Sequence, residues 1–210
     1  MSTGKFIVFE GIDGSGKSTQ ASLLAARLEE RGRRVHRTAE PTTLETGKAL
    51  REVLSGKKKK TECEIATMFV SDRIAHNTDA EYGIFALTER GTDVISDRYY
   101  YSNLAYQGQS TDYGWVKAMN TKCPMIKRPD VCIYLDLLPA QSLERISARS
   151  TAREIYESEE KLTSVRAAFL SAIEDLRADG ETILVFDAYK DIEALSDEIF
   201  SAIAELFELN

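Results

Sequence analysis

The sequence predicts an α/β fold in which helices flank a parallel sheet of five strands. Short apolar runs alternate along the chain with segments of helical periodicity, which is the pattern of repeated β–α–β units. A glycine-rich segment joins the first apolar run to the first helical segment. The length of 210 residues suits one domain, residues 1–210, with room for a short lid but hardly for a second domain.

Five short apolar runs are expected to form the strands. They are residues 5–10, 34–38, 93–97, 131–136 and 182–187. In a parallel sheet with helices on both faces, active residues lie at the carboxyl ends of the strands. The residues that follow these runs are therefore the candidates for a functional site.

Helical segments between the strands are marked by apolar residues three or four positions apart. The marking residues are Ala21, Leu24, Ala25 and Leu28 in the first segment, Ile65, Met68, Phe69, Ile74 and Ala75 in a longer one, and Val165, Phe169 and Ile173 in a late one. The first is expected to stop at Arg31-Gly32 and the late one at Asp179-Gly180, because glycine follows many helix ends. Pro139 is expected to open another helix from its first turn.

The glycine-rich segment has the pattern G-x-x-x-x-G-K-S, between a strand-type run and a helix. In that context main-chain N–H groups and the helix N-terminus converge on phosphate oxygens. Lys17 would reach the β- and γ-phosphates, and the Ser18 hydroxyl would ligate Mg²⁺. The expected ATP-binding residues of this loop are Gly11, Gly14, Ser15, Gly16, Lys17, Ser18 and Thr19. The alternative is an ordinary glycine-rich turn, but the full pattern predicts a P-loop NTPase fold that binds a nucleoside triphosphate.

Two predicted strands end in aspartate, Asp97 and Asp136. Either carboxylate could hold Mg²⁺ through water beside the P-loop. Arg98 follows Asp97 at once, so a cation-organising group and a phosphate-binding group would emerge at the same strand end. An apolar turn follows Asp136 instead. We therefore expect Asp97 to hold the metal and Asp136 to serve a strand-end turn or a helix cap.

The composition excludes several classes of protein. The formal net charge of −7 argues against a general nucleic-acid binder, because phosphate backbones are held by basic surfaces. The basic run at residues 57–60 is expected to be a solvated linker. Three cysteines without C-x-x-C spacing favour a reduced, cytoplasmic chain. Two histidines make a His-rich metal site unexpected, and no apolar run approaches the length of a membrane span.

Further motifs follow one another over most of the chain. They are Glu40-Pro41 with Gly47 and Arg51; Phe69-x-x-x-Arg73; Asp97-Arg98-Tyr99 with Ser102, Ala105, Tyr106, Gln107 and Gly108; Arg128-Pro129-Asp130; Leu143-x-Arg145 with Arg149 and Arg153; and Phe186-Asp187-Ala188. In this order they resemble the thymidylate kinases, a family of P-loop nucleoside monophosphate kinases. The resemblance implies an enzyme of nucleotide biosynthesis that moves the γ-phosphoryl of ATP onto dTMP, giving dTDP, with Mg²⁺ and usually as a homodimer.

The resemblance also implies which residues hold the thymine base and the sugar. Phe69 would stack on the base and Arg73, four residues later on the same helix face, would donate to a base carbonyl. The alternatives are a core aromatic for Phe69 and a surface ion pair for Arg73. Asn103 and Gln107 fall where the family has base-contacting polar residues, and Tyr106 falls where a ring packs under the deoxyribose.

Arginines are expected to hold the phosphate of the acceptor. A phosphate acceptor is already ionised near neutral pH, so transfer needs positioning and charge neutralisation more than a strong base. Arg98 and Arg51 suit this role because a guanidinium binds phosphate through two parallel hydrogen bonds. Asp13 resembles the acidic residue near the sugar 3′-hydroxyl and the acceptor phosphate; the alternative for it is solvation of the loop.

A polar segment at about residues 145–157 is expected to form a lid over ATP. Arg145, Arg149 and Arg153 lie four apart, and the alternative is a helix with arginines on its wet side. Some members of the resembled family carry an arginine at a variable P-loop position, and those without one take it from the lid. Residues 12–15 include no arginine here, so the resemblance implies that the lid supplies one to the transferring phosphoryl group. Arg145 is expected to bind ATP. The expected catalytic residues are Lys17, Arg98, Arg149, Arg153 and Asp13.

Two other functions remain open from the sequence. One is another small P-loop kinase that acts on a nucleoside or a different nucleotide. The other is a P-loop switch or ATPase subunit that uses hydrolysis to change partners. The base-reading N-K-x-D of GTPases is absent, and the segment Leu54-Ser55-Gly56-Lys57 stops short of the L-S-G-G-Q of ABC proteins.

Overall fold

The computed structural model describes residues 3–147 and 159–209, and the strands within them form a parallel sheet. The strands are β1 (Phe6–Glu10), β2 (Val35–Ala39), β3 (Asp93–Asp97), β4 (Val131–Asp136) and β5 (Ile183–Asp187). Their spatial order is β2-β3-β1-β4-β5. The five predicted strands are confirmed, and none of their bounds moves by more than one residue.

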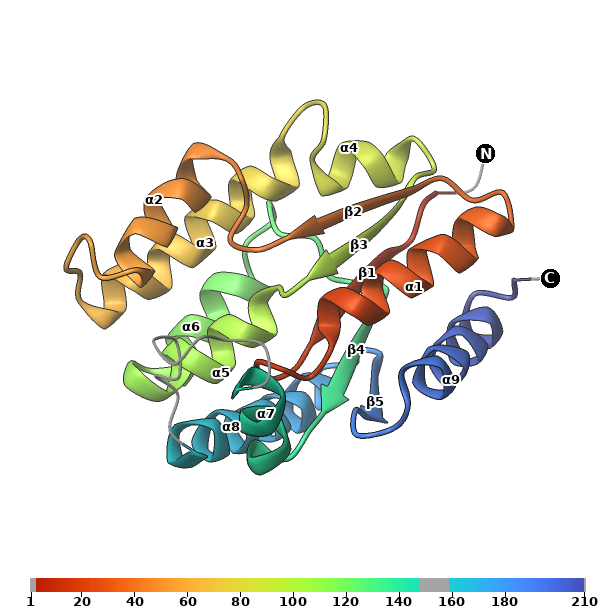
Figure 1. The fold of residues 1–210 in the computed structure, drawn as a ribbon. Helices are drawn as coiled ribbons and strands as arrows, with labels where there is room; N and C mark the ends of the chain where they lie inside the picture. The colour runs from red at the N-terminus through yellow and green to blue at the C-terminus, as the bar shows by residue number, and fades with distance from the viewer. Residues whose placement is uncertain (1–2, 148–158, 210) are drawn as a thin grey trace.

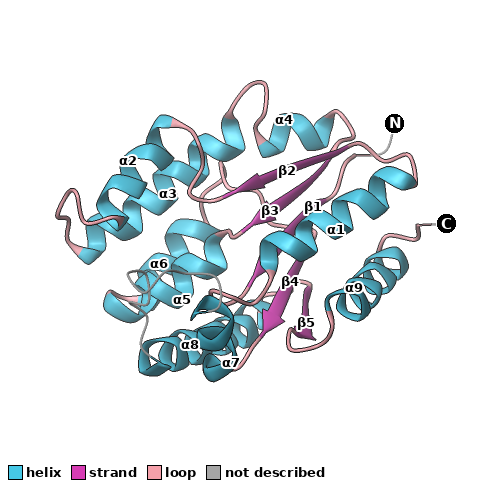
Figure 2. Ribbon diagram, viewed as in Figure 1, coloured by secondary structure: helices cyan, strands magenta, loops and turns pink. Residues whose placement is uncertain are grey.

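The central strands are apolar because both of their faces are covered. All residues of β1, and all but the last of β3 and β4, are buried. Figure 1 shows α1 (Lys17–Glu30) and α9 (Ile192–Leu206) on one side of the sheet. The other side carries α3 (Glu62–Thr78), α5 (Tyr100–Ser110) and α8 (Glu159–Ala178). This layered arrangement of helices and strands is also visible in Figure 2, and it is the α/β architecture that the alternation of segments predicted.

The remaining helices attach to these layers. They are α2 (Glu45–Leu54), which packs on α3; α6 (Tyr113–Thr121), which packs on α5; α4 (Ile84–Glu89); and α7 (Pro139–Ser147), which packs on α8. Pro139 opens α7, as predicted. Gly32 and Gly180 follow the ends of α1 and α8 with φ of 75° and 83°, so both predicted helix ends are confirmed. Among the described residues, no helix is both long and apolar enough to span a membrane.

Helix α3 has a buried face that is largely polar. Its N-terminus is closed by a capping box between Thr61 and Glu64. Apolar residues marked this helix in the sequence, yet the side chains it buries include Asp72, Arg73 and His76. Buried polar groups are costly unless they are hydrogen-bonded. The partners of this face therefore determine what the helix can do.

Candidate active site

The P-loop follows β1 and bends into α1 at a residue that must be glycine. Gly16, the N-cap of α1, has φ 95°, a conformation that L side chains rarely adopt. Gly11 has φ 147°, and a Cβ there would lie 2.6 Å from the carbonyl oxygen of Leu135 on β4. The glycines thus allow the loop to pass close to the sheet while its N–H groups stay available at the helix N-terminus.

Lys17 lies folded across this loop. Its Nζ donates to the main-chain oxygens of Gly11 and Ile12, at 3.0 Å each. Burial, and after it the charge of Arg98, lowers the pKa of Lys17 to about 8. A buried cation held by main-chain oxygens is ready to exchange them for phosphate oxygens.

The end of β3 brings a carboxylate to the P-loop. Because β3 pairs with β1 in the register Phe9↔Asp97, Asp97 lies beside the start of the loop. The Ser18 hydroxyl donates a hydrogen bond to the Asp97 carboxylate. The two residues help to line a cavity of about 240 Å³ together with Asp13, Gly14, Gly16, Lys17, Thr19 and Arg98. Hydroxyl and carboxylate oxygens are the ligands that Mg²⁺ prefers, and Mg²⁺ at a nucleotide needs only one or two from the protein.

Asp136, the other strand-end aspartate, has a different partner. Both of its carboxylate oxygens accept from Arg166 of α8, at 2.7 Å each. This bidentate pair was not expected from the sequence. A carboxylate already bound in this way is a poorer candidate for the metal than Asp97.

Arg98 is held in a strained conformation at the same edge of the sheet. Its φ is 75°, which is uncommon for a residue other than glycine. Main-chain hydrogen bonds fix it: its N–H donates to Phe9 at 2.9 Å, and its carbonyl accepts from Ser96 Oγ at 2.7 Å. Its guanidinium forms an ion pair with Asp13 and donates to Ser102 at 3.0 Å. The ion pair with Asp13 holds the guanidinium beside the P-loop.

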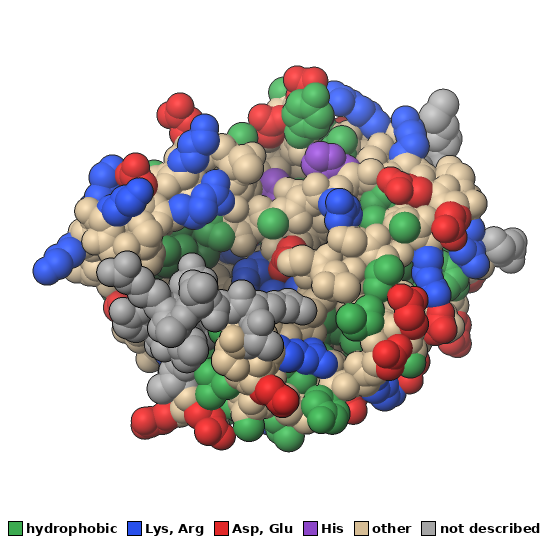
Figure 3. Space-filling view, viewed as in Figure 1, with side chains coloured by type: hydrophobic (Ala, Val, Ile, Leu, Met, Phe, Trp, Pro, Cys, Tyr) green, Lys and Arg blue, Asp and Glu red, His purple; other side chains and the backbone are tan. Residues whose placement is uncertain are grey.

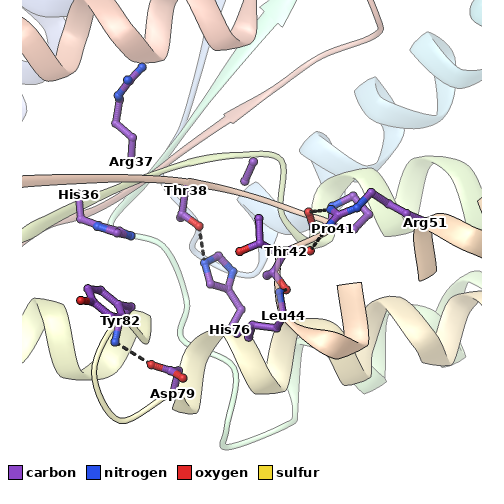
Figure 4. A pocket seen from close by; sticks show the side chains of 12 residues that line it. His36, Arg37, Thr38, Pro41, Thr42, Leu44, Arg51, His76, Asp79 and Tyr82 are labelled. Atoms are coloured by element: carbon purple, nitrogen blue, oxygen red, sulfur yellow. Dashed lines mark hydrogen bonds between the residues drawn. The ribbon is translucent and has the colours of Figure 1, made fainter. Parts of the chain in front are cut away.

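Of the expected acceptor-side residues, Arg51 makes main-chain contacts. Its guanidinium donates to the carbonyl oxygens of Pro41 and Thr42, at 2.6 and 2.5 Å (Figure 4). Helix α2 thereby fixes the loop that follows β2. The loop is also tied to α3, because Asp72 accepts from the Thr42 N–H and hydroxyl and from the Thr46 hydroxyl at 2.6–2.7 Å.

Arg73 is fully buried rather than on the surface. It forms an ion pair with the buried Glu40 at 2.6 Å and donates to Asn120. Its guanidinium also lies 5.0 Å from the ring centroid of Tyr99. Within the described residues its Nε has no hydrogen-bond partner. A buried donor without a partner fits an acceptor that arrives with a ligand.

The other residues expected at the base and sugar lie on α3 and α5. Phe69 is only half-buried and is not part of the hydrophobic core. Asn103 is fully buried and donates to Gln107 Oε1 at 3.1 Å. Tyr106 packs edge-on against Phe169, and the Arg98 guanidinium lies 5.8 Å from its ring centroid. That contact brings the expected sugar-binding ring beside the expected phosphate-binding arginine.

Arg145 of α7 reaches over the start of α1. It donates to the carbonyl oxygen of Ala188 at 2.9 Å and more weakly to that of Gly14 at 3.4 Å. A cavity of about 140 Å³ opens here, lined by Ser15, Gly16, Thr19, Gln20, Arg145, Ala188, Lys190, Ile192 and Leu195. The sequence motif Phe186-Asp187-Ala188 marked this loop without giving it a role. Arg149 and Arg153 of the expected lid lie outside the described residues.

A larger cavity of about 520 Å³ runs along the outer edge of β2. Its lining includes both histidines of the chain, which are purple in the hollowed face of Figure 3. His76 bridges Thr38 at 2.9 Å and Glu40 at 3.0 Å, and Tyr82 faces His36 (Figure 4). His76, like Asp72 and Asn120, was missed in the sequence, because a polar residue on a helix does not reveal a partner that is distant in the chain.

Comparisons with known proteins agree over nearly the whole chain. A family model described as thymidylate kinase matches residues 9–199. A probable thymidylate kinase of Pyrococcus horikoshii is 40% identical, over 91% of this chain and 95% of its own length. One from Methanococcus aeolicus is 37% identical over 96% of each chain. A thymidylate kinase of Leptospira borgpetersenii is 40% identical over 83% of this chain and 85% of its own length.

Proposed function

The chain belongs to the thymidylate kinase family, and from this premise we propose how its residues divide the work of phosphoryl transfer. It is a phosphotransferase that uses ATP to convert dTMP to dTDP. Nothing in the fold favours another P-loop kinase or a nucleotide switch. Lys17, Ser18, Asp97 and Arg98 line one cavity at the P-loop, and this arrangement supports the roles given to them below.

The donor nucleotide occupies the P-loop and the cavity beneath Arg145. Main-chain N–H groups of the loop hold the β- and γ-phosphates, and Lys17 turns from the oxygens of Gly11 and Ile12 to neutralise them. Arg145 and the loop at Ala188 enclose the far end of the nucleotide. These groups act mainly through position and charge.

Ser18 and Asp97 would hold Mg²⁺. Their oxygens already lie within hydrogen-bond reach of each other, beside the positions that the phosphates would take. When bound, the ion neutralises charge on the phosphate oxygens and helps to orient them. Lys17 and Arg98 flank this pair, so positive charge surrounds the group that moves.

The acceptor lies between the β2–α2 loop, α3 and α5. Arg98 binds the dTMP phosphate. Asp13 orients the Arg98 guanidinium through their ion pair and lies near the sugar 3′-hydroxyl. Arg51 shapes the loop at Pro41 and supports the same phosphate. Phe69 stacks on thymine, Tyr106 packs under the deoxyribose, and the base contacts come from Arg73, Asn103 and Gln107.

The lid and the assembly of two chains complete the enzyme. Arg149 and Arg153 bring positive charge to the transferring phosphoryl group. Residues 1–210 act as one domain, and two copies form a homodimer in the cytoplasm, where the free cysteines Cys63, Cys123 and Cys132 stay reduced. Light scattering after size-exclusion chromatography tests the dimer: a monomeric mass at working concentration would contradict it.

A Mg²⁺ titration of the activity tests whether Ser18 is a ligand of the metal. Ser18→Ala should raise the Mg²⁺ concentration for half-maximal activity at least about tenfold, since it removes one protein oxygen. The matched control is Ser22→Ala, one turn later on α1, whose hydroxyl donates to the Ser18 carbonyl and which should leave the Mg²⁺ requirement unchanged. Equal Mg²⁺ requirements in all three proteins would overturn the metal assignment. In the same assay dTMP should be a substrate and thymidine should not.

A further inference from the structure

A line of buried side chains connects the expected base-binding residues to one another. Arg73 of α3 donates to Asn120 Oδ1 of α6. Asn120 Nδ2 donates to Asn103 Oδ1 of α5 at 2.9 Å, and Asn103 Nδ2 donates to Gln107 Oε1 at 3.1 Å. Three of these side chains are fully buried, and Gln107 is 9% exposed.

Arg73, at one end of this line, determines how the carboxamide groups of Asn120 and Asn103 are oriented. An arginine side chain has only donors, so the group of Asn120 that faces Arg73 must be its carbonyl oxygen. The Asn120 NH₂ then points the other way, where the Asn103 oxygen and the Val116 carbonyl accept from it at 2.9 Å each. Asn103 must therefore present its oxygen to Asn120 and its NH₂ to Gln107.

We infer that Asn120 is a positioning residue that fixes the orientation of the Asn103 carboxamide and thereby selects thymine over cytosine in the acceptor. The inference rests on the proposed base site and names a residue that touches no substrate. Asn120 acts through its two neighbours. It holds the Arg73 guanidinium on one side and stops the Asn103 amide from turning on the other.

The fixed orientation matches one kind of base edge. Thymine presents a carbonyl oxygen at C4 and an N–H at N3, whereas cytosine presents an amino group at C4 and a bare nitrogen at N3. Arg73 offers donors to the C4 carbonyl, and the Asn103 oxygen keeps a second lone pair for the N3 hydrogen. Both contacts become repulsive with cytosine. An Asn103 free to turn could offer its NH₂ to cytosine N3 instead.

Turning the amides in the intact protein would leave buried groups unmatched. Reversing Asn103 sets its NH₂ against the NH₂ of Asn120, and reversing Asn120 sets its NH₂ against the Arg73 guanidinium. Glu40 prevents Arg73 from moving away, because their ion pair is itself buried. Rearranging the network would therefore cost free energy, because buried hydrogen-bonding groups would lose their partners.

The test compares three nucleotides in wild type and in Asn120→Asp. The carboxylate still accepts from Arg73 but cannot donate to Asn103, so Asn103 can turn its NH₂ towards it. The ratio of kcat/KM for dTMP to that for dCMP should fall at least about tenfold. The ratio of dTMP to dUMP should stay within about twofold, because these two bases share the same edge and differ by a methyl group.

Asn77→Asp is the matched control. Asn77 is equally buried on α3 and bonds to Tyr99 and Arg73 main chain, but it is outside the amide line. It should lower the activity with all three nucleotides together. If Asn120→Asp does not fold, Asn120→Ser, which is neutral and too short to reach both neighbours, replaces it with the same expected fall.

Two results would overturn the inference. One is a folded Asn120 variant whose dTMP to dCMP ratio stays within about twofold of wild type. The other is a wild-type enzyme that phosphorylates dCMP as well as dTMP. Failure of the base site itself gives a different result, because Phe69→Ala and Arg73→Ala would then leave KM for dTMP unchanged.

Discussion

The proposed donor side, which would bind ATP, and the proposed acceptor side, which would bind dTMP, are built in different ways. On the donor side, one stretch of nine residues from Gly11 to Thr19 supplies main-chain groups, a lysine and a hydroxyl, and Asp97 of β3 adds a carboxylate. The proposed lid arginines also belong to this side. On the acceptor side, side chains from Glu40 to Asn120 come together from four helices and a loop, and most are buried. The donor side depends on the path of the backbone, and the acceptor side depends on hydrogen bonds between distant residues.

This difference decides what a substitution should change. The donor-side residues Ser18 and Asp97 line a cavity and are not buried in the core, so their loss should lower turnover and leave stability almost intact. Acceptor-side groups such as Arg73 also fill the interior, so their loss should lower both the stability and the affinity for dTMP. Measuring both quantities for each variant tests the comparison directly.

The largest effect is expected on the donor side, from the lid. The double variant Arg149→Ala, Arg153→Ala should lower kcat by about 10³-fold or more, because an arginine at the transferring phosphoryl group is worth ~10³–10⁵ in rate. KM for dTMP should change little, since this contact forms mainly in the transition state. Steady-state kinetics measures both, and a kcat near the wild-type value would contradict the lid assignment.

On the acceptor side, Glu40→Ala should destabilise the fold strongly. It leaves the Arg73 guanidinium buried without its carboxylate and His76 without one of its two partners. Removing one member of a buried ion pair costs ~3–5 kcal/mol, and KM for dTMP should rise as Arg73 moves. Urea unfolding measures the loss, with the surface pair Lys58–Glu52 as control: Glu52→Ala should have no measurable effect. Equal stability of the two variants would show that the Glu40–Arg73 ion pair does not stabilise the fold.

On the donor side, Asp97→Asn should lower turnover without lowering stability. It keeps the shape and a partner for Ser18 but removes the charge that we propose for the Mg²⁺ site. We expect kcat to fall by roughly 10²–10³-fold, the scale of losing one group that stabilises transition-state charge. The unfolding midpoint should stay at the wild-type value. A variant that kept more than about a tenth of the wild-type kcat would show that Asp97 is not the metal carboxylate.

The same difference explains how much the sequence could predict. The strands and the P-loop were predicted because their signals are local: apolar runs, and glycines at fixed offsets from Lys17. The ion pair of Glu40 with Arg73 joins residues 33 positions apart, and the Arg73–Asn120 bond joins residues 47 apart. No local pattern records such pairs, so Arg73 could be expected at the base only by family resemblance and its burial could not be expected at all.

A smaller effect is expected from Phe69→Ala, which separates affinity from stability within the acceptor side. Phe69 is half-buried and lies outside the core, so its loss should cost little stability. Stacking on a base is worth ~1–3 kcal/mol by alanine substitution, so KM for dTMP should rise by roughly tenfold while KM for ATP stays constant. Loss of folding with unchanged dTMP affinity would make Phe69 a core aromatic instead.

The smallest effect is expected at Glu181, which lies outside both the donor side and the acceptor side. We expect this buried carboxylate to affect the stability of the fold and not the activity. Both oxygens accept hydrogen bonds, from Tyr100 at 2.8 Å and Tyr101 at 2.5 Å, and burial raises the pKa of Glu181 above its ordinary value near 4.5. The folded protein therefore keeps the Glu181 proton at a pH where the unfolded chain has already lost it.

This difference makes the stability depend on pH. Above about pH 4.5 the unfolding free energy falls as the pH rises towards the folded-state pKa of Glu181, by at most ~1.4 kcal/mol per pH unit. Glu181→Gln has no proton to lose, so relative to the variant the wild type should lose stability across that window, while kcat and KM for dTMP stay the same in both. Urea unfolding at pH values from about 4 to 7 measures the difference. Parallel curves for the two proteins would show that the buried carboxylate does not retain its proton, and a changed KM for dTMP would place Glu181 within the acceptor side after all.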